Sequence, residues 1–352
     1  MNLRECRMVS LHRLMDYACD GKLTIQDIFL MLGGIRNSIY YFHVRGMEMI
    51  GTGGTEEINC PGVFDTYNIS YEAISANQFE KEMKDCDIAK SPFFYIIPVM
   101  GEMLNKSVEE FEDIGTFGQS FFLVDSYENG RAHFYYPIQD TWVDINVIKE
   151  AEKDKGWVVE SDFCIFKIDK KALKENEFIH SLASKSRKDF VLDILRKFNE
   201  KSVQKGDLGT VRIDGIEAYD RVIDYFEGMK KYLRGCNGKA KKCFLNYIYL
   251  QMFQFRKFIL SGTDGYYRSE FNTILHELFS DDEKYREILN KWDVLETAWR
   301  NIGRVLSKTC NYNYSRMHPV ECIDSIEEFW KEMRCIEPKL VEETINIIES
   351  VA

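Results

Sequence analysis

Residues 6–44, CRMVSLHRLMDYACDGKLTIQDIFLMLGGIRNSIYYFHV, contain two helical patterns followed by a strand pattern. Apolar side chains recur at 3.6-residue spacing over residues 8–18, which predicts an amphipathic helix with Cys6 at its head. Residues 24–34 open with a capping-box pattern and close with two glycines, as a second short helix does. The aromatic run at residues 38–44 then predicts a strand.

A cysteine at the head of a helix has two interpretations. The positive end of the helix dipole stabilises a thiolate, so Cys6 is a candidate nucleophile. It is also one of ten cysteines that are scattered singly, without the C-x-x-C pairs of zinc ribbons or thioredoxin-like sites. Most of them are expected to be free thiols that act as small core residues.

Composition limits the function classes. A length of 352 residues and a hydrophobic content of 45% predict a folded protein of two domains. The formal charge of -11 disfavours nucleic-acid binding, which needs basic surfaces. Because the sequence contains neither a 20-residue apolar run nor a signal-peptide pattern, we expect a cytoplasmic protein that does not enter the membrane.

The strand patterns gather in the first half of the chain. Asn129 and Gly130 predict a tight hairpin between two of the strands, and residues 72–90 read as a helix. From about residue 170 only helical periodicity is recognised. The predicted fold class is therefore α+β, with a mixed domain at residues 1–168 and an all-helical domain at residues 169–352. The strand patterns after residue 44 are PFFYIIPV, SFFLVDSY, RAHFYYP and WVVESDFCIFKI.

A cysteine-headed helix followed by an antiparallel sheet resembles papain-like folds, in which a histidine on the sheet deprotonates the cysteine. More specifically, residues 5–44 are similar to the start of the butirosin-biosynthesis acyltransferase family, whose N-terminal domain is papain-like. SFFLVDSYENGRAHFYYP resembles the strand–turn–strand of that family, and SGTDGYYRSEFNTILHEL and ILNKWDVLETAWRNIGRVL resemble its helical half. The resemblance implies a papain-like N-terminal domain and a helical C-terminal domain.

The family's catalytic pattern is altered in this chain. Counting back from Tyr127 puts Ser120 at the family's histidine position, and counting to Pro137 puts Tyr136 at its aspartate position. Neither side chain is a base near neutral pH. Cys6 keeps the nucleophile position, and Tyr41, His43 and Gln119 are candidate binding residues.

The histidines do not supply an obvious substitute base. Strand alternation places His133 on the face opposite to Tyr136, and His12 faces away from Cys6 on the same helix. His43 lies in a region that shapes the cleft in the family, and for each of these histidines a core or surface role is the simpler interpretation than that of a base. The resemblance therefore leaves a nucleophile position without its usual partners.

The sequence leaves two candidate functions for this protein. The resemblance implies acyl transfer from the phosphopantetheine thioester of an acyl or peptidyl carrier protein to a small-molecule amine acceptor, in natural-product biosynthesis and with no bound cofactor. The alternative is an inactive relative that binds a carrier protein, a peptide or a small molecule in the same cleft. Peptidase activity is disfavoured, because amide cleavage needs proton transfer to the leaving amine. Whether the protein forms a homo-oligomer is left open.

Three further motifs have weaker interpretations. GTGGT at residues 51–55 lacks the lysine and the following helix of a phosphate-binding loop, so a flexible loop at the cleft mouth is favoured. GKAKK at residues 238–242 is a basic patch that suits an acidic carrier protein, although a solvated loop is the simpler interpretation. The acidic clusters show no metal-ligand spacing, so no metal site is expected.

Overall fold

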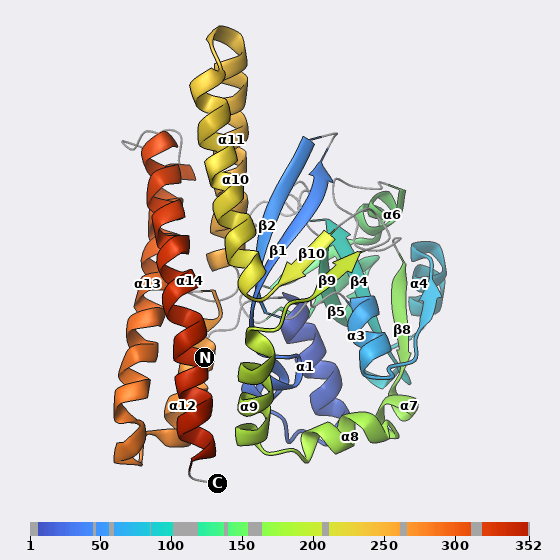
Figure 1. Ribbon diagram of the computed structural model, residues 1–352. Helices are drawn as coiled ribbons and strands as arrows, with labels where there is room; N and C mark the ends of the chain where they lie inside the picture. Colours follow the sequence, from blue (N-terminus) through green and yellow to red (C-terminus); the bar gives the residue numbers. More distant parts are fainter. Residues whose placement is uncertain are drawn as a thin grey trace. The chain divides into compact units, whose positions relative to one another are not determined.

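The computed structural model shows an α+β protein with two antiparallel sheets (Figure 1). It divides into two compact units that interleave along the chain. Unit 1 consists mainly of Leu32–Glu56 and Ser186–Ala352, and unit 2 of Asn2–Met31 and Glu57–Lys185. The domain boundary predicted at residue 168 divides the chain by sequence position, whereas these two units are defined by spatial contacts. That boundary therefore stays a prediction. The structure describes residues 6–44, 47–55, 60–84, 86–100, 119–136, 140–153, 164–205, 211–260, 266–310 and 319–350.

Unit 2 contains a six-stranded sheet in the order β3-β8-β4-β5-β6-β7, with antiparallel neighbours throughout. Its helices and strands, in chain order, are α1 (Cys6–Ala18), α2 (Ile25–Met31), α3 (Cys60–Thr66), β3 (Glu72–Ile74), α4 (Ala76–Met83), η1 (Ile88–Lys90), β4 (Phe93–Met100), β5 (Gln119–Glu128), β6 (Arg131–Phe134), β7 (Thr141–Asp144), α6 (Ile145–Lys153), β8 (Ile165–Asp169), α7 (Lys170–Lys174) and α8 (Glu177–Ala183).

The short elements at the start of the chain form as the sequence predicts. The backbone N–H of Thr24 donates to the Asp27 carboxylate at 2.8 Å, and the N–H of Asp27 donates back to the Thr24 hydroxyl at 3.2 Å, which completes the capping box of α2. Gly33 and Gly34 both have positive φ, as a left-handed helix stop requires. Asn129 and Gly130 also have positive φ, which confirms the tight hairpin between β5 and β6.

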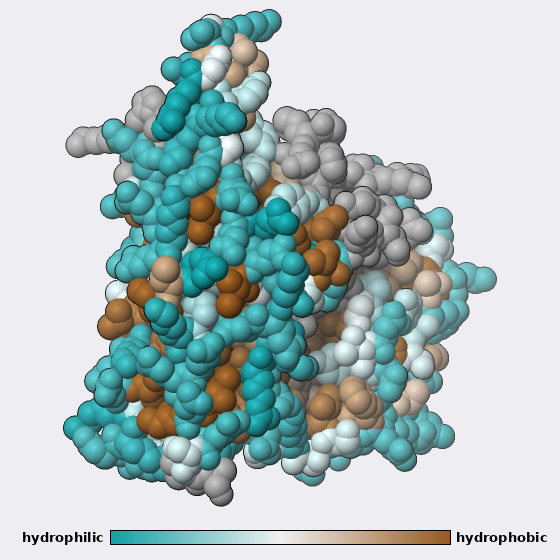
Figure 2. Space-filling view, in the orientation of Figure 1, coloured by the Kyte–Doolittle hydropathy of each residue, from teal (hydrophilic) through white to brown (hydrophobic). Residues whose placement is uncertain are grey.

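Unit 1 contains a four-stranded antiparallel sheet, β2-β1-β10-β9, and a set of long helices. Helices α10, α11, α13 and α14 pack against one another in pairs (Figure 1). In the face shown in Figure 2 their outer surfaces are mainly hydrophilic, as amphipathic helices require. The elements are β1 (Ile35–Val44), β2 (Met47–Thr55), α9 (Arg187–Phe198), β9 (Val203–Lys205), β10 (Val211–Asp214), α10 (Ile216–Gly235), α11 (Gly238–Leu260), α12 (Arg268–Phe279), η2 (Glu283–Tyr285), α13 (Arg286–Cys310) and α14 (Pro319–Glu349).

The C-terminal half is not all-helical, so that prediction was wrong. Strands β9 and β10 follow residue 169, and β10 pairs with β1. Both strands are too short for a sequence pattern, and side chains hold them in place. Asp214 accepts hydrogen bonds from Ser38 at 2.7 Å and from Arg212 at 2.6 Å, and Ser202 also donates to it.

Two local predictions also need correction. Residues 72–90 are not one helix, because β3 precedes α4 and η1 follows it. The GTGGT segment is neither a phosphate-binding loop nor a flexible loop, because it forms the end of β2. Its glycines allow close packing: a Cβ on Gly53 would lie 2.6 Å from the Tyr40 hydroxyl, and one on Gly54 would lie 2.7 Å from the carbonyl oxygen of Tyr266.

A fully buried ion pair lies at the centre of unit 1. Arg268 and Glu337 are both 0% exposed, and Nε of Arg268 donates to the Glu337 carboxylate at 2.7 Å. Nη1 of Arg268 donates to the carbonyls of Arg36, Tyr266 and Gly54, at 2.9, 2.9 and 3.3 Å. These bonds connect α12 to α14, to β1 and to β2.

Aromatic side chains also contact the buried guanidinium of Arg268. The Arg268 guanidinium lies 4.6 Å from the ring centroid of Tyr266 and 5.0 Å from that of Trp299. The Tyr219 hydroxyl donates to the second carboxylate oxygen of Glu337. Burial, together with the Glu337 charge, raises the pKa of Tyr219 well above its ordinary value, so the phenol keeps its proton.

Breaking this ion pair should destabilise unit 1 strongly. We expect Arg268→Met to lower the free energy of unfolding by about 3–5 kcal/mol, because Glu337 is left charged and buried without a cation. The double variant Arg268→Met/Glu337→Met should be less destabilised than the single variant, since no uncompensated charge remains. Denaturant unfolding measures both, and additive losses would contradict the assignment.

Gly54→Ala should also destabilise the protein, by about 1–3 kcal/mol, because the new methyl group meets backbone rather than a movable side chain. Gly228→Ala in α10 is the matched control, since nothing lies within 4 Å of its Cβ position. That control should be neutral or stabilising by up to about 1 kcal/mol. Equal thermal unfolding midpoints for the two variants would show that β2 does not depend on this close approach.

Candidate functional site

Helix α1 begins at Cys6 and is joined to the six-stranded sheet by Ser10. The Ser10 hydroxyl donates to the carbonyl of Phe121 and accepts from the backbone N–H of Leu123, both at 3.0 Å. Ser10 is 0% exposed, so these bonds are protected from water. Strand β6 pairs with β5 only at Val124 and the residues that follow it. The Ser10 hydroxyl therefore binds backbone groups of β5 that precede this pairing. The first turns of the cysteine-headed helix are thereby fixed to β5.

The strand register assigns faces to the residues at the expected catalytic positions. Ser120 lies opposite Val99, and Phe122 lies opposite Ile97, so Ser120 shares a sheet face with Phe122. Tyr136 packs edge-on against Phe122, with ring centroids 5.7 Å apart. Ser120 and Tyr136 therefore belong to the same face, the one that carries the apolar core against α4 and α6.

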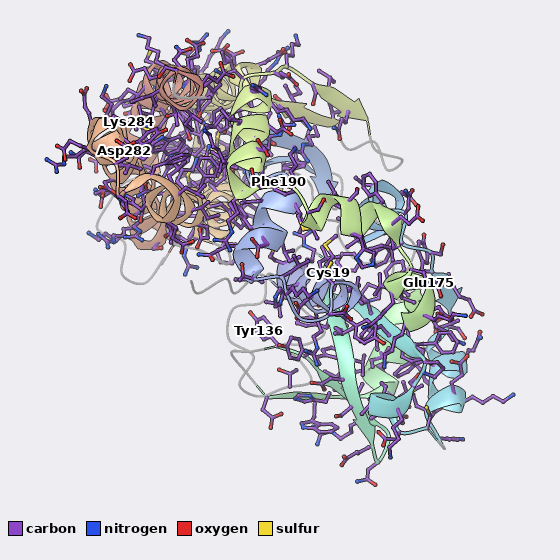
Figure 3. All side chains as sticks on the ribbon, turned by 90° about the horizontal axis from the view of Figure 1, so that it is seen from below. Cys19, Tyr136, Glu175, Phe190, Asp282 and Lys284 are labelled. Atoms are coloured by element: carbon purple, nitrogen blue, oxygen red, sulfur yellow. The ribbon has the colours of Figure 1, made fainter. Side chains whose placement is uncertain are left out.

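Figure 3 shows Tyr136 beside the strands of this sheet, and the residue is partly buried. The side chains of Cys6, Gln119, Ser120 and His43 lie outside the described part of the structure, although their backbones are placed in α1, β5 and β1. Gln119 pairs with Met100 and so falls on the sheet face opposite to Ser120.

The candidate binding residues separate into two groups. Tyr41 and His43 belong to β1 in unit 1, where Tyr41 pairs with Ile50 and Val211, and His43 pairs with Glu48. Cys6, Gln119, Ser120 and Tyr136 all belong to unit 2. The sheet divides the second group further, because Ser120 and Tyr136 lie on the face that packs on α4 and α6, whereas α1 packs on the opposite face, where Arg13 lies over the Tyr135 ring. The expected catalytic positions are therefore not brought together on one face.

His133 lies on the sheet face away from Tyr136, as strand alternation predicts. Its neighbours Ala132 and Phe134 are in the core that Tyr136 packs against. On the opposite face Nδ1 of His133 lies 2.5 Å from the Asp125 carboxylate, and Nε2 lies 2.8 Å from that of Asp140. Both ring nitrogens of His133 therefore contact carboxylates on the sheet face away from Tyr136.

The other histidines with described side chains are also bonded locally. His12 contacts the carbonyl of Leu23 at 3.1 Å, and His180 contacts the carbonyl of Lys174 at 2.8 Å. His276 lies 3.0 Å from the Asp293 carboxylate. Within the described part of the chain, then, no histidine is placed with Tyr136.

A cavity of about 500 Å³, which no sequence pattern indicated, lies along α1. Lys170 donates to the carbonyl of Ser91 at 2.6 Å, and burial lowers the pKa of its ammonium group. Lys174 pairs with Asp20 and lies over the Tyr17 ring. Sequence reasoning missed this cavity because its walls come from distant segments. They are formed by Arg13, Asp16, Tyr17, Asp20, Gly21, Ala89, Phe94, Lys170 and Lys174.

Comparison with known proteins adds no assignment: no family model matches the chain, and no curated protein matches it. Within the described residues, no group of three or more His, Cys, Asp and Glu side chains is arranged to hold a metal ion. Among the described helices, none combines the length and apolar character that a bilayer crossing requires. The site is therefore interpreted from its own geometry.

Ser10→Ala tests whether α1 depends on its contact with β5. The substitution leaves the Phe121 carbonyl and the Leu123 N–H buried without this partner, so we expect a loss of about 1–3 kcal/mol in the free energy of unfolding. Ser181→Ala is the control, because its exposed hydroxyl bonds only within α8 and should matter by less than about 0.5 kcal/mol. Equal unfolding free energies would contradict the anchoring role.

Proposed function

We propose that this protein transfers an acyl group from the phosphopantetheine thioester of a carrier protein to an amine acceptor, through Cys6 in a papain-like unit 2. One observation carries the proposal. The helix that begins at Cys6 is hydrogen-bonded through Ser10 to β5. Its Tyr17 and Arg13 contact Phe94 and Tyr135, which lie on the sheet face opposite to Ser120 and Tyr136. A cysteine-headed helix fixed to an interior strand of an antiparallel sheet supports the proposal, whereas the hydroxyl residues at the family's base and orienting positions lie across the sheet from that helix.

In the first step the Cys6 thiolate attacks the thioester carbonyl. A new carbon–sulfur bond forms to Cys6, the bond to the pantetheine sulfur breaks, and the proton of the original Cys6 thiol ends on the released pantetheine thiol. The position of Cys6 at the first residue of α1 favours this step, because the helix N-terminus stabilises a thiolate.

In the second step the neutral amine attacks the acyl-cysteine. The amide bond forms, the carbon–sulfur bond to Cys6 breaks, and one amine proton returns to the cysteine sulfur. A thioester activates the carbonyl more than an amide does, so positioning the two reactants supplies much of the rate. Ser120 and Tyr136 lie on the sheet face away from α1, so neither is assigned a part in this step.

A binding protein without covalent chemistry is the second candidate. It is favoured by the histidines with described side chains, all of which are bonded elsewhere, and by hydroxyl residues at both positions where the family has a base and its orienting carboxylate. In that case the protein would bind its ligand without forming a bond to Cys6.

Intact-protein mass spectrometry with octanoyl-pantetheine distinguishes the two candidates. We expect one octanoyl group per chain on Cys6, absent from Cys6→Ala and released as an amide when an amine is added. Cys243 and Cys335 are exposed and serve as internal controls. If the pKa of Cys6 lies one unit below theirs, it should be labelled about threefold faster near neutral pH, because the thiolate fraction rises about tenfold while the reactivity of the thiolate falls about threefold.

Acylation of Cys243 and Cys335 at the same rate as Cys6 would overturn the covalent mechanism. The second candidate would then be tested by titrating the same thioester into Cys6→Ala and measuring binding by calorimetry.

A further inference from the structure

The segment from Gly228 to Thr263 has an unusual charge composition. Its 36 residues contain eight lysines and arginines and no aspartate or glutamate, although 57 of the 352 residues in the chain are acidic. The formal charge of the whole chain is -11, so this segment opposes the sign of the rest of the protein. A local excess of this kind creates a field that attracts anionic surfaces.

The structure concentrates this charge at one end of a helical hairpin. Helix α10 ends at Gly235 and α11 begins at Gly238, so residues 231–242, here called the hairpin tip, turn from one helix into the next. In Figure 1 the tip projects beyond the other helices of unit 1. The exposed cations of the tip are Lys231, Arg234, Lys239, Lys241 and Lys242.

These five cations lack the carboxylate partners that are common elsewhere in the protein. Within the described part of the chain no ion pair involves them, whereas the adjacent Lys230 pairs with Asp324 at 3.1 Å and also with Glu327. The charges of the tip therefore face solvent without an internal counterion. Figure 2 shows the same region as a mainly hydrophilic surface at the top of the view.

The local backbone adds to the positive charge. Lys239, Lys241 and Lys242 occupy the start of α11, whose first turn contains no acidic residue. The N-terminus of a helix already carries a partial positive charge, so lysines there oppose the helix dipole. A folding argument would favour Asp or Glu at these positions. An anionic partner reverses the preference, because it benefits from both the lysines and the helix terminus.

The tip also offers an aromatic contact. Tyr232 is 54% exposed, and its ring centroid lies 4.4 Å from that of Phe244. Cations that surround an exposed tyrosine are a common composition for a protein interface, because the aromatic ring supplies contact area and the charges supply orientation.

We propose that the hairpin tip docks an acidic face of the carrier protein that delivers the acyl thioester. This inference rests on the proposed function, since it assigns the partner's landing surface for the same reaction. A protein partner is favoured over nucleic acid because five cations form a compact patch on a chain of net charge -11, which repels an extended polyanion. Charges at the rim of an interface mainly raise the association rate, and salt weakens their effect. Binding at the hairpin tip should therefore weaken as the salt concentration rises.

A charge-reversal pair tests the surface. The tip variant is Lys239→Glu/Lys241→Glu/Lys242→Glu. The control is Lys197→Glu/Lys308→Glu/Lys339→Glu, which alters three exposed lysines of unit 1 on α9, α13 and α14. Each triple substitution takes the formal charge from -11 to -17, so the two variants have the same net charge. Because Lys197 and Lys308 lie in the last turns of α9 and α13, where glutamate opposes the helix dipole, circular dichroism first establishes that the control variant is folded.

The probe is an acyl carrier protein bearing an octanoyl thioester, with its binding followed by fluorescence anisotropy at low and at physiological salt. We expect the tip variant to bind about tenfold more weakly than the wild type, and the control variant to bind within about twofold of it. Loss of binding cannot be ascribed to unfolding of α11, since glutamates at its N-terminus favour the helix.

The outcomes separate the docking inference from the catalytic proposal. Octanoyl-pantetheine lacks the carrier protein, so acylation of Cys6 by it should be unchanged in the tip variant. Tip-dependent binding of the carrier protein without acylation of Cys6 would support the docking surface and reject the catalysis. Equal binding by the tip variant and the control would overturn the docking inference, as would tip-dependent binding of single-stranded DNA without binding of the carrier protein.

Discussion

Arg268 carries a charge in the core of unit 1, where no part of it is exposed, so the elements around it have to supply acceptors and aromatic faces. Helix α14 supplies the Glu337 carboxylate, and β1 and β2 supply backbone carbonyls. An uncompensated charge at this depth would cost about 3–5 kcal/mol, which is a large share of the stability of most domains. The constraint explains why sequence segments more than 200 residues apart belong to one compact unit.

In unit 2 the position of α1 depends on a buried hydroxyl group, as unit 1 depends on a buried ion pair. Ser10 satisfies two backbone groups of β5 where β6 is not paired with that strand, so the position of α1 is set by hydrogen bonds as well as by apolar packing. Because Cys6 begins the same helix, the nucleophile position is placed by a structural serine one turn away. The proposed chemistry thus depends on a residue that takes no part in it.

Charge is distributed unevenly between the body of the protein and the hairpin tip. In the body, lysines such as Lys149, Lys167 and Lys291 lie within 3.0 Å of a carboxylate. At the tip five cations are exposed without such partners, and three of them oppose a helix dipole. Local stability does not account for this arrangement, and the proposed recognition of an acidic surface would account for it.

The sequence alone determined the elements whose signals are local. The capping box of α2, the Asn129–Gly130 turn and the long amphipathic helices all follow from residues within a few positions of one another. The sequence also predicted that α1 begins at Cys6 and that His133 and Tyr136 lie on opposite faces, but it did not show that α1 packs on the face away from Ser120 and Tyr136. Tertiary structure alone decided where β9 and β10 pair, why GTGGT is a strand, and which cavity lies along α1. Those features arise from contacts between distant segments, and a buried charge, a missing Cβ or a shared cavity wall leaves no periodic pattern in the chain.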